Sequence, residues 1–344
     1  MAKETADRLI FIGVDGGGTK TACLVADGTG RILGAGLGGP INLNFVSEET
    51  ARASMGQAVG SAWRAAGPPP QPPAVAGVSG PIALALSAEI ITQETGAASV
   101  IGVGEGEAAW KAVSPWLTHD CGVAVDAGTG SLAFGFNREG ERAGAGGAGT
   151  LLGDEGSGYW IGLEAMRAAL RAEDGRGPPT RLKEALCTAL SLRHIRELIH
   201  LIYQIGMKRH EVAALAPVVA HVAREGDATA ARILAEAGRE LALDAEAVVR
   251  RLKMEDEAFA VVPFGSVFAA GPLLVDPFRE AVQQVAPGAQ IVEAHYAPVV
   301  GSLMAAMEAG GIELKGAFLQ HFSEELARHP LALGPKLRSS SQGD

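Results

Sequence analysis

The sequence has few of the residues that build a disulfide scaffold or a metal centre. Its three cysteines, Cys23, Cys121 and Cys187, lie far apart in the 344 residues and form no C-x-x-C pair. This usage disfavours a disulfide framework and suits a reducing cytosol. The histidines are scattered, without H-E-x-x-H or zinc-finger spacing, so they indicate no site for a transition metal.

Long apolar runs and an excess of positive charge are also missing. The chain contains no run of about 18 apolar residues, the length a membrane helix needs. Its first residues, "MAKETADR", lack the apolar core of a signal peptide. A net charge of −10 disfavours nucleic acid or an anionic membrane as the main partner. We therefore expect a cytoplasmic protein that binds neither.

Glycine and apolar residues are abundant: the chain has 46 glycines and is 47% hydrophobic. Its length suffices for two domains. The opening "LIFIGVDGGGTKTACLVADGTGRILGAG" predicts a strand, a glycine-rich hairpin, a strand, a turn at Asp27–Gly28 and a third strand. Helical patterns follow at 48–66 and near 82–95, separated by "PPPQPP", which predicts a surface connection.

The same scheme restarts in the second half of the chain. "VAVDAGTGSLAFGFNREGERAGAG" aligns with "IGVDGGGTKTACLVADGTGRILGAG", and each has a strand, a glycine turn and a second strand. Residues 160–260 have mainly helical periodicity, and "AFAVVPFGSVFAAGPLLVDPF" then predicts a strand, a turn and a helix. This internal duplication predicts two similar α/β domains with a cleft between them.

The first glycine turn, "VDGGGTKT", has the composition of a phosphate-binding loop. Consecutive glycines leave backbone N–H groups unshielded, and Thr19 and Lys20 add a hydroxyl and a positive charge. Asp15 ends the strand before this turn, where a carboxylate suits Mg²⁺ held through water. The spacing is not that of a P-loop, because no G-x-x-x-x-G-K-[ST] is present.

Two further glycine-rich segments carry polar residues. "VDAGTGS" also has the composition of a phosphate-binding loop, with Thr129 and Ser131 as hydrogen-bond donors. "GGAGTLLGDEGSGYWIG" places Asp154 and Glu155 in a loop before a helix. Acidic residues at a helix start are ordinary, but this loop has more glycine than a helix cap needs.

The segment "SVIGVGEGEAAW" allows two interpretations. Gly104 to Ala109 fits the loose G-x-G-x-x-A form of a dinucleotide fingerprint, with Asp126 as the ribose-binding acid. Alternatively, Glu105 serves another chemistry. A Rossmann half runs from its first strand directly into a helix, whereas both halves of this chain begin with hairpins, so the hairpins disfavour the dinucleotide interpretation.

The motifs "GVDGGGTKT", "AGTGS" and above all "GDEGSGYWIG" resemble the N-acetylglucosamine kinase group of the BadF/BadG/BcrA/BcrD ATPase family, within the actin–hexokinase–sugar-kinase superfamily. The resemblance implies an α/β fold of duplicated actin-like ATPase (ribonuclease H-like) domains around an interdomain cleft. It implies an N-terminal domain of residues 1–118, completed by about 313–330, and a C-terminal domain of residues 119–312. The composition of the last residues, with "SSSQGD", predicts a disordered tail of residues 331–344.

The resemblance also implies ATP and Mg²⁺ as cofactors, a sugar substrate and a homodimer. Glu105 falls where the family has an aspartate that takes the proton of the sugar hydroxyl, and Asp15 supports Mg²⁺. The implied ATP-binding residues are Gly17, Gly18, Thr19, Lys20, Gly128, Thr129, Gly130, Gly226, Gly265 and Ser266. The implied sugar-binding residues are Asn42, Glu105, Ser131, Gly147, Gly149, Thr150 and Asp154.

Three departures from the family pattern bear on the substrate. Glu105 is one methylene longer than the family's aspartate, Ala148 replaces a frequent tryptophan, and Leu132 replaces an asparagine. The leading hypothesis is ATP-dependent phosphorylation of a hexosamine or related sugar. The alternative is a non-kinase ATPase or a nucleotide- or sugar-binding regulator of the same fold. The spread of the three cysteines counts against an activator ATPase that shares an iron–sulfur cluster.

Overall fold

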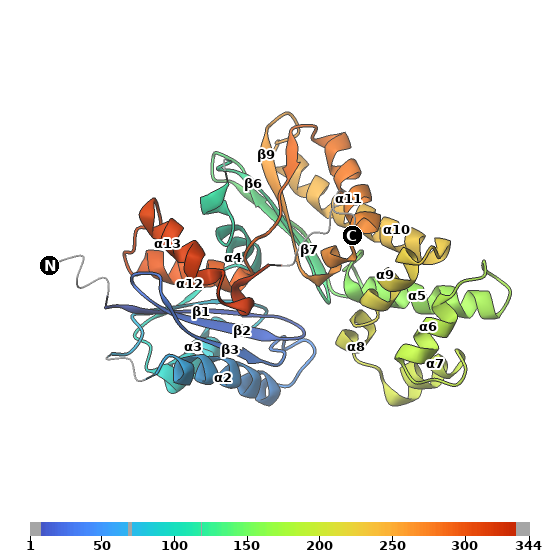
Figure 1. Cartoon of the computed structure of the whole chain (residues 1–344), viewed down its shortest axis with the longest axis horizontal. Helices are drawn as coiled ribbons and strands as arrows, with labels where there is room; N and C mark the ends of the chain where they lie inside the picture. The colour runs from blue at the N-terminus through green and yellow to red at the C-terminus, as the bar shows by residue number, and fades with distance from the viewer. Residues whose placement is uncertain (1–7, 68–70, 118, 335–344) are drawn as a thin grey trace. The chain divides into compact units, whose positions relative to one another are not determined.

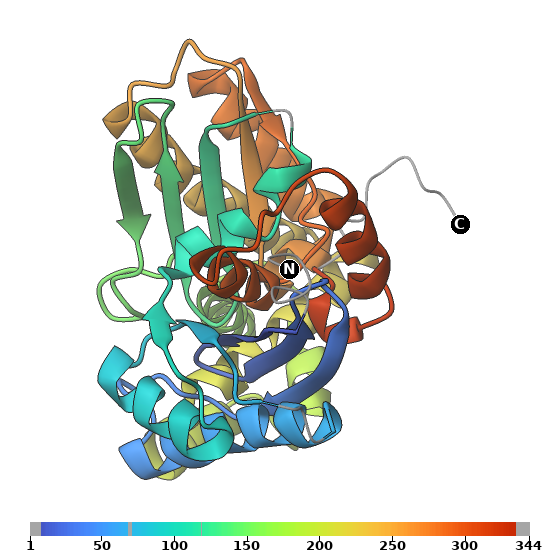
Figure 2. The ribbon, with the colours of Figure 1, turned by 90° about the vertical axis from the view of Figure 1, so that its left-hand side faces the viewer.

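The computed structural model describes residues 8–67, 71–117 and 119–334, and these form two compact units. Unit 1 contains the described residues of Met1–Thr118 together with Ala294–Gly334, and unit 2 contains those of His119–Glu293. Figure 2 shows the C-terminal helices, in dark red, beside the blue N-terminal strands of unit 1. Unit 1 thus takes the chain back from Ala294, earlier than the return near residue 313 that the resemblance implied.

Unit 1 is built on a five-stranded sheet in the order β3-β2-β1-β4-β5. The first three strands are antiparallel, as predicted, while β4 and β5 run parallel to β1. The glycine turn after β1 and the Asp27 turn after β2 join the antiparallel strands. The strands are β1 (Ile10–Gly16), β2 (Thr21–Asp27), β3 (Ile32–Gly38), β4 (Val75–Ser79) and β5 (Val100–Gly102).

Helices cover both faces of this sheet, because alternate residues of β1 point to opposite sides. Ile12 packs in the core beneath α2 and α3, and Phe11 packs in the core beneath α12. Figure 1 shows α2 and α3 on one side of the strands and α12 and α13 on the other. The helices are α2 (Glu48–Ala65), α3 (Leu84–Thr95), α4 (Glu105–Lys111), α12 (Pro298–Ala309) and α13 (Ala317–Leu326), and short 3₁₀ turns span Ser114–Trp116 and Pro330–Ala332.

The last described residues belong to unit 1. Leu333 forms an isolated β-bridge with Tyr296, and Ala332 is fully buried. Residues 331–334 are therefore not part of the predicted tail, and residues 335–344 lie outside the described residues.

Unit 2 repeats the strand arrangement of unit 1. Its sheet has the order β10-β9-β6-β7-β8, with β6, β7 and β8 antiparallel and with β9 and β10 parallel to β6. The duplication predicted from the two glycine-turned hairpins is confirmed. The strands are β6 (Gly122–Ala127), β7 (Ser131–Phe136), β8 (Arg142–Gly146), β9 (Phe259–Phe264) and β10 (Ala289–Ile291).

The segment predicted to be mainly helical, residues 160–260, is mainly helical. The longest helix, α10, begins at its N-cap Asp227, whose side chain accepts the N–H of Ala230, and buries a stripe of alanine and leucine. The helices of unit 2 are α5 (Gly158–Glu173), α6 (Leu182–Ala189), α7 (Glu197–His200), α8 (Arg209–Ala213), α9 (Ala216–Arg224), α10 (Ala228–Arg251) and α11 (Pro272–Val285). A short π-helix spans Leu201–Ile205 and a 3₁₀ turn spans Ser266–Ala270. Among the described helices, none combines the length and the apolar character that crossing a membrane requires.

Candidate active site

At one edge of the unit 1 sheet, three strand ends bring Asp15 close to the start of α4. Strands β1, β4 and β5 are parallel neighbours, so Asp15, Ser79 and Gly104 lie at or just after strand ends on the same edge. Strands are about 4.8 Å apart, which separates the ends of β1 and β5 by roughly 10 Å. Glu105 is the first residue of α4, with Gly104 as its N-cap, and therefore starts at this edge.

The turn after β1 is open enough to accept a ligand. The Gly17 N–H donates to the carbonyl of Lys20 at 2.9 Å, which closes a tight hairpin. A Cβ atom on Gly17 would meet no atom within 4 Å, and Thr19 and Lys20 are exposed. Backbone amides, a hydroxyl and a cation in such a turn can bind phosphate oxygens.

Asp15 lies half-buried at the start of this turn. Its Oδ1 accepts the hydroxyl of Ser79 at 2.6 Å. Burial raises the pKa of Asp15, and the Ser79 hydrogen bond and the nearby Lys20 act in the opposite direction. The described residues contain no group of three metal-binding side chains. One carboxylate beside a turn that can bind phosphate oxygens fits Mg²⁺, which keeps several waters and binds through one or two carboxylates and phosphate oxygens.

Asn42 follows a residue that packs against the same turn. Ile41 donates its N–H to the Gly17 carbonyl, and its side chain fills the space where a Cβ of Gly16 would lie. The Asn42 side chain accepts the N–H of Asn44 at 3.0 Å. This local bond fixes the start of the loop that leads into α2.

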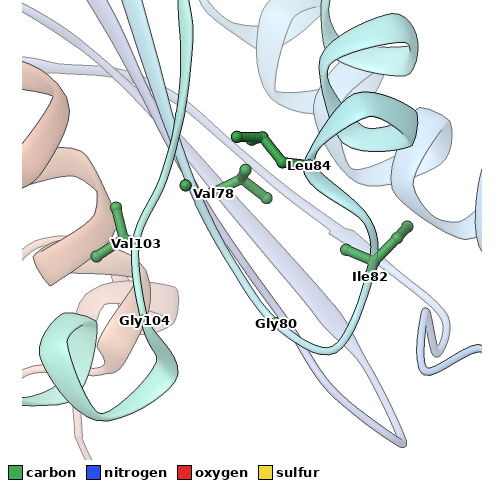
Figure 3. Close-up of a pocket in the computed structure, with 7 residues that line it drawn as sticks. Val78, Gly80, Ile82, Leu84, Val103 and Gly104 are labelled. Atoms are coloured by element: carbon green, nitrogen blue, oxygen red, sulfur yellow. The ribbon is translucent and has the colours of Figure 1, made fainter.

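A small pocket opens between the ends of β4 and β5. It has a volume of about 260 Å³ and is lined by Val78, Gly80, Ile82, Leu84, Gly102, Val103 and Gly104. Figure 3 shows Gly80, Ile82 and Leu84 on one side and Val103 and Gly104 on the other, where the chain turns into α4. The pocket therefore lies directly before Glu105, and its walls are apolar side chains and backbone.

In unit 2 the second glycine turn and the long glycine-rich loop are joined. The Ser131 N–H donates to Asp154 Oδ1 at 3.4 Å, and the Ser131 hydroxyl donates to the Glu155 carbonyl at 2.9 Å. The Gly147 N–H donates to the Ser131 carbonyl at 2.9 Å. Three residues that the sequence assigned to sugar binding, Ser131, Gly147 and Asp154, are thus brought together.

Arg209, which the sequence analysis did not single out, completes this cluster. Its Nη2 lies 2.5 Å from Asp154 Oδ2, and the two side chains are only 17% and 6% exposed. Its guanidinium carbon lies 5.7 Å from the ring centre of Tyr159. The only signal for Arg209 in the sequence is its position at a helix start, which does not identify a partner.

The rest of the loop has a backbone that favours glycine. Gly146, Gly147 and Gly149 all have positive φ, and Asp154 has a φ of 59°. Thr150 is half-buried, and the next two residues, Leu151 and Leu152, are largely exposed. The loop therefore presents backbone amides, a hydroxyl and two apolar side chains on the surface of unit 2.

The remaining predicted nucleotide-binding residues lie at one edge of the unit 2 sheet. Because β6 and β9 are parallel neighbours, the Gly128–Gly130 turn and Gly265–Ser266 follow strand ends at the same edge. A Cβ on Gly265 would lie 2.3 Å from the Ala127 carbonyl, so only glycine allows this close approach. Gly226 follows the C-cap of α9, a helix that packs against the 3₁₀ turn that begins at Ser266.

Each unit thus has a hairpin-turned mixed sheet with a glycine turn at its edge, the arrangement of two-domain ATPases of the actin-like class. The chain belongs to the BadF/BadG/BcrA/BcrD ATPase family, which it matches over residues 12–306. The match covers both glycine turns, Gly265 and the loop of residues 147–157 between β8 and α5, which is called the Asp154 loop below.

Relatives of the chain include named sugar kinases. It is 32% identical to an N-acetylmuramic acid/N-acetylglucosamine kinase of Clostridium acetobutylicum, over 82% of this chain and 92% of that one. It is 29% identical to an N-acetyl-D-glucosamine kinase of Dictyostelium discoideum, over 89% and 99% of the two chains.

Among solved structures, a protein of Chromobacterium violaceum assigned as an N-acetylglucosamine kinase superposes with a TM-score of 0.70 at 26% identity, covering 87% of this chain and 99% of its own. A ROK family glucokinase of Streptomyces griseus superposes with a TM-score of 0.56 at 17% identity, covering 87% of this chain and 99% of its own, and indicates the fold alone.

Proposed function

We propose that this chain is an ATP-dependent sugar kinase that transfers the γ-phosphoryl group of ATP to a hydroxyl of a hexosamine or related sugar. Family membership and the two named kinase relatives support the reaction class. One structural observation carries the proposal: Ser131, which follows the second glycine turn, donates hydrogen bonds to Asp154 and Glu155 of the Asp154 loop. A sugar-binding loop and a phosphate-binding turn that share hydrogen bonds suit phosphoryl transfer between the two ligands.

The residues of unit 1 suit the reacting groups. Glu105 takes the proton of the sugar hydroxyl as that oxygen attacks the γ-phosphate. Asn42 binds the sugar, and the pocket before Glu105 receives part of the sugar ring or a substituent. The Gly17–Lys20 turn, with Thr19, binds phosphate oxygens through backbone amides, a hydroxyl and the lysine charge.

The residues of unit 2 bind the other parts of the two ligands. Gly128, Thr129 and Gly130 contact phosphate oxygens, and Gly226, Gly265 and Ser266 contact the adenosine. Ser131, Gly147, Gly149, Thr150 and Asp154 hold the sugar. Arg209 keeps the Asp154 carboxylate in place. Ala148 and Leu132 replace the tryptophan and asparagine of the family pattern and add no polar side chain beside these residues.

Mg²⁺ is the proposed metal cofactor, held by Asp15 through water. When bound, it would offset negative charge on the phosphate oxygens. The Asp15 carboxylate needs to be ionised for this role. Burial raises the pKa of Asp15, while the Ser79 hydroxyl and Lys20 act against that shift, and a bound cation would favour the ionised form further.

We also propose a cytoplasmic homodimer. ATP-dependent chemistry and three free thiols suit a reducing compartment. A mean hydropathy of +0.17 and the prevalence of two-fold dimers among soluble oligomers support self-association. Light scattering at micromolar concentration tests the dimer, and a mass near the 35.3 kDa of one chain would contradict it.

The reaction is tested by a coupled ADP-release assay over a panel of sugars, with a control that contains no sugar. We expect turnover that depends on a hexosamine or related sugar. Turnover of ATP that is independent of any sugar would instead identify a non-kinase ATPase. A rise in melting temperature with Mg-ATP or Mg-ADP tests nucleotide binding separately, because a ligand that binds only the native state stabilises it.

A further inference from the structure

A chain of two buried serine hydroxyls ends on Asp15. The Ser302 hydroxyl donates to Ser79 Oγ at 3.1 Å, and the Ser79 hydroxyl donates to Asp15 Oδ1 at 2.6 Å. Ser79 is 1% exposed and Ser302 is fully buried. These two hydrogen bonds connect helix α12, through the end of strand β4, to the end of strand β1.

Close contacts at two glycines fix the position of α12 against the sheet of unit 1. A Cβ on Gly77 of β4 would lie 2.2 Å from the Ser302 carbonyl oxygen, and a Cβ on Gly13 of β1 would lie 2.5 Å from Leu303. Side chains at these two positions would push α12 away from the sheet. The glycines therefore bring Ser302 within hydrogen-bond distance of Ser79.

The hydroxyl chain gives the Asp15 carboxylate one orientation. A carboxylate at a strand end rotates readily about its terminal bond, since that torsion has no sharp minima. A hydrogen bond from Ser79 restricts the rotation, and Ser302 occupies the acceptor side of Ser79, which leaves the Ser79 hydrogen directed at Asp15. The same hydrogen bond favours the ionised carboxylate.

We propose that Ser79 and Ser302 are positioning residues that hold the Asp15 carboxylate in the orientation needed to bind the magnesium–nucleotide complex. This inference rests on the proposed function of Asp15. A purely structural role would be that the two serines only satisfy each other's hydrogen bonds in the core. The Mg²⁺ dependence of nucleotide binding separates these roles, since loss of a core hydrogen bond does not change it.

The test compares Ser79→Ala, Ser302→Ala and Asp15→Asn with the natural chain. Calorimetry measures ADP affinity at a series of Mg²⁺ concentrations, and the Mg²⁺ dependence of sugar-dependent turnover is measured alongside. We expect Ser79→Ala to raise the required Mg²⁺ concentration by about tenfold, the effect of a hydrogen bond to a charged group. Ser302→Ala acts through Ser79 and should raise it by roughly two- to fivefold. ADP binding without Mg²⁺ should be unchanged.

Three further variants make the assignment specific. In the Asp15→Asn background, Ser79→Ala should add no further change in Mg²⁺ dependence, because the two residues act in series. Ser87→Ala is the matched control: Ser87 is fully buried on α3, and its hydroxyl donates to the Ala83 carbonyl and not to Asp15. It should lower the melting temperature and leave the Mg²⁺ dependence unchanged. Ser79→Thr, which keeps the hydroxyl, should have the same Mg²⁺ dependence as the natural chain.

The outcomes distinguish the inference from the proposed function. If Ser79→Ala and Ser302→Ala behave like Ser87→Ala while Asp15→Asn raises the Mg²⁺ requirement, the serines are structural and the inference is wrong. If Asp15→Asn also leaves the Mg²⁺ dependence of ADP binding unchanged, the proposed role of Asp15 fails, and the inference fails with it. The binding measurement decides both cases even if no tested sugar is phosphorylated.

Discussion

Arg209 and Asp154, 55 residues apart in the sequence, form a nearly buried ion pair with 2.5 Å between Nη2 and Oδ2. Removing one partner of such a pair leaves an uncompensated charge in a poorly solvated position. Arg209→Met keeps most of the apolar length and removes the charge. We expect it to lower the free energy of unfolding by about 3 kcal/mol, measured by urea denaturation.

Arg167→Met is the control for that change. Arg167 pairs with Glu164 on the surface of α5, where the two side chains are 55% and 26% exposed. Exposed pairs contribute about 0–1 kcal/mol, so this variant should unfold close to the natural chain. Equal losses in the two variants would mean that the Arg209–Asp154 pair does not stabilise the loop.

Asp244 should make stability depend on pH. Burial, together with Glu155, Glu240 and Asp154, raises the pKa of Asp244 to about 6 from a usual 3.8. The native state therefore holds this proton more tightly than the unfolded state, and this contribution to stability is lost as pH rises from about 3.8 to about 6. Asp244→Asn should raise the melting temperature more at pH 7.5 than at pH 4.5. A gain that is the same at both pH values would contradict the pKa assignment.

Gly301 sets how closely α12 approaches α4, the helix that Glu105 begins. A Cβ on Gly301 would clash with the Ala108 carbonyl, so Gly301→Ala should displace α4 and cost on the order of 1–3 kcal/mol. Gly56→Ala is the matched control, since a Cβ there meets only the Glu94 side chain at 3.4 Å. In helix α2 this control should be neutral or stabilising by up to about 1 kcal/mol. Urea denaturation of both variants checks the prediction, and an unchanged Gly301→Ala protein would contradict it.

Glu105 is the proposed base, and its substitution should separate catalysis from binding. We expect Glu105→Gln to reduce sugar-dependent turnover by about 100-fold or more, within the range that general bases contribute, with ADP affinity intact. Glu105→Asp reports the geometry: a loss of rate indicates a site built for the longer acid, and a gain indicates that the family's aspartate fits better. If neither variant changes turnover, Glu105 is only an acid at a helix start, and Glu107 or Asp154 is the next candidate.

The local features of the fold were predictable because they depend on neighbouring residues. Strand alternation around "DGGGTKT" and "DAGTGS" predicted both hairpins, and the helical pattern at 48–66 matches α2. The dinucleotide interpretation of Gly104 fails on topology: β5 is an edge strand, and the chain leaves the sheet after α4.

The pairings that define the candidate site were not predictable from local pattern. Ser79 and Ser302 are 223 residues apart, and nothing near either residue indicates its partner. Arg209 carried no signal beyond its helix start, since its partner is selected by tertiary packing alone.

Direct detection of the phosphorylated sugar tests the proposed reaction most simply. The protein is incubated with Mg-ATP and, separately, with N-acetylglucosamine, glucosamine, N-acetylmuramic acid or glucose, and the products are followed by phosphorus NMR and mass spectrometry. A sugar kinase predicts a sugar phosphate formed in equal amount to ADP with at least one of these sugars, and its loss in Glu105→Gln. Release of ADP and inorganic phosphate at one rate, whether or not sugar is present, and with no sugar phosphate, would contradict it.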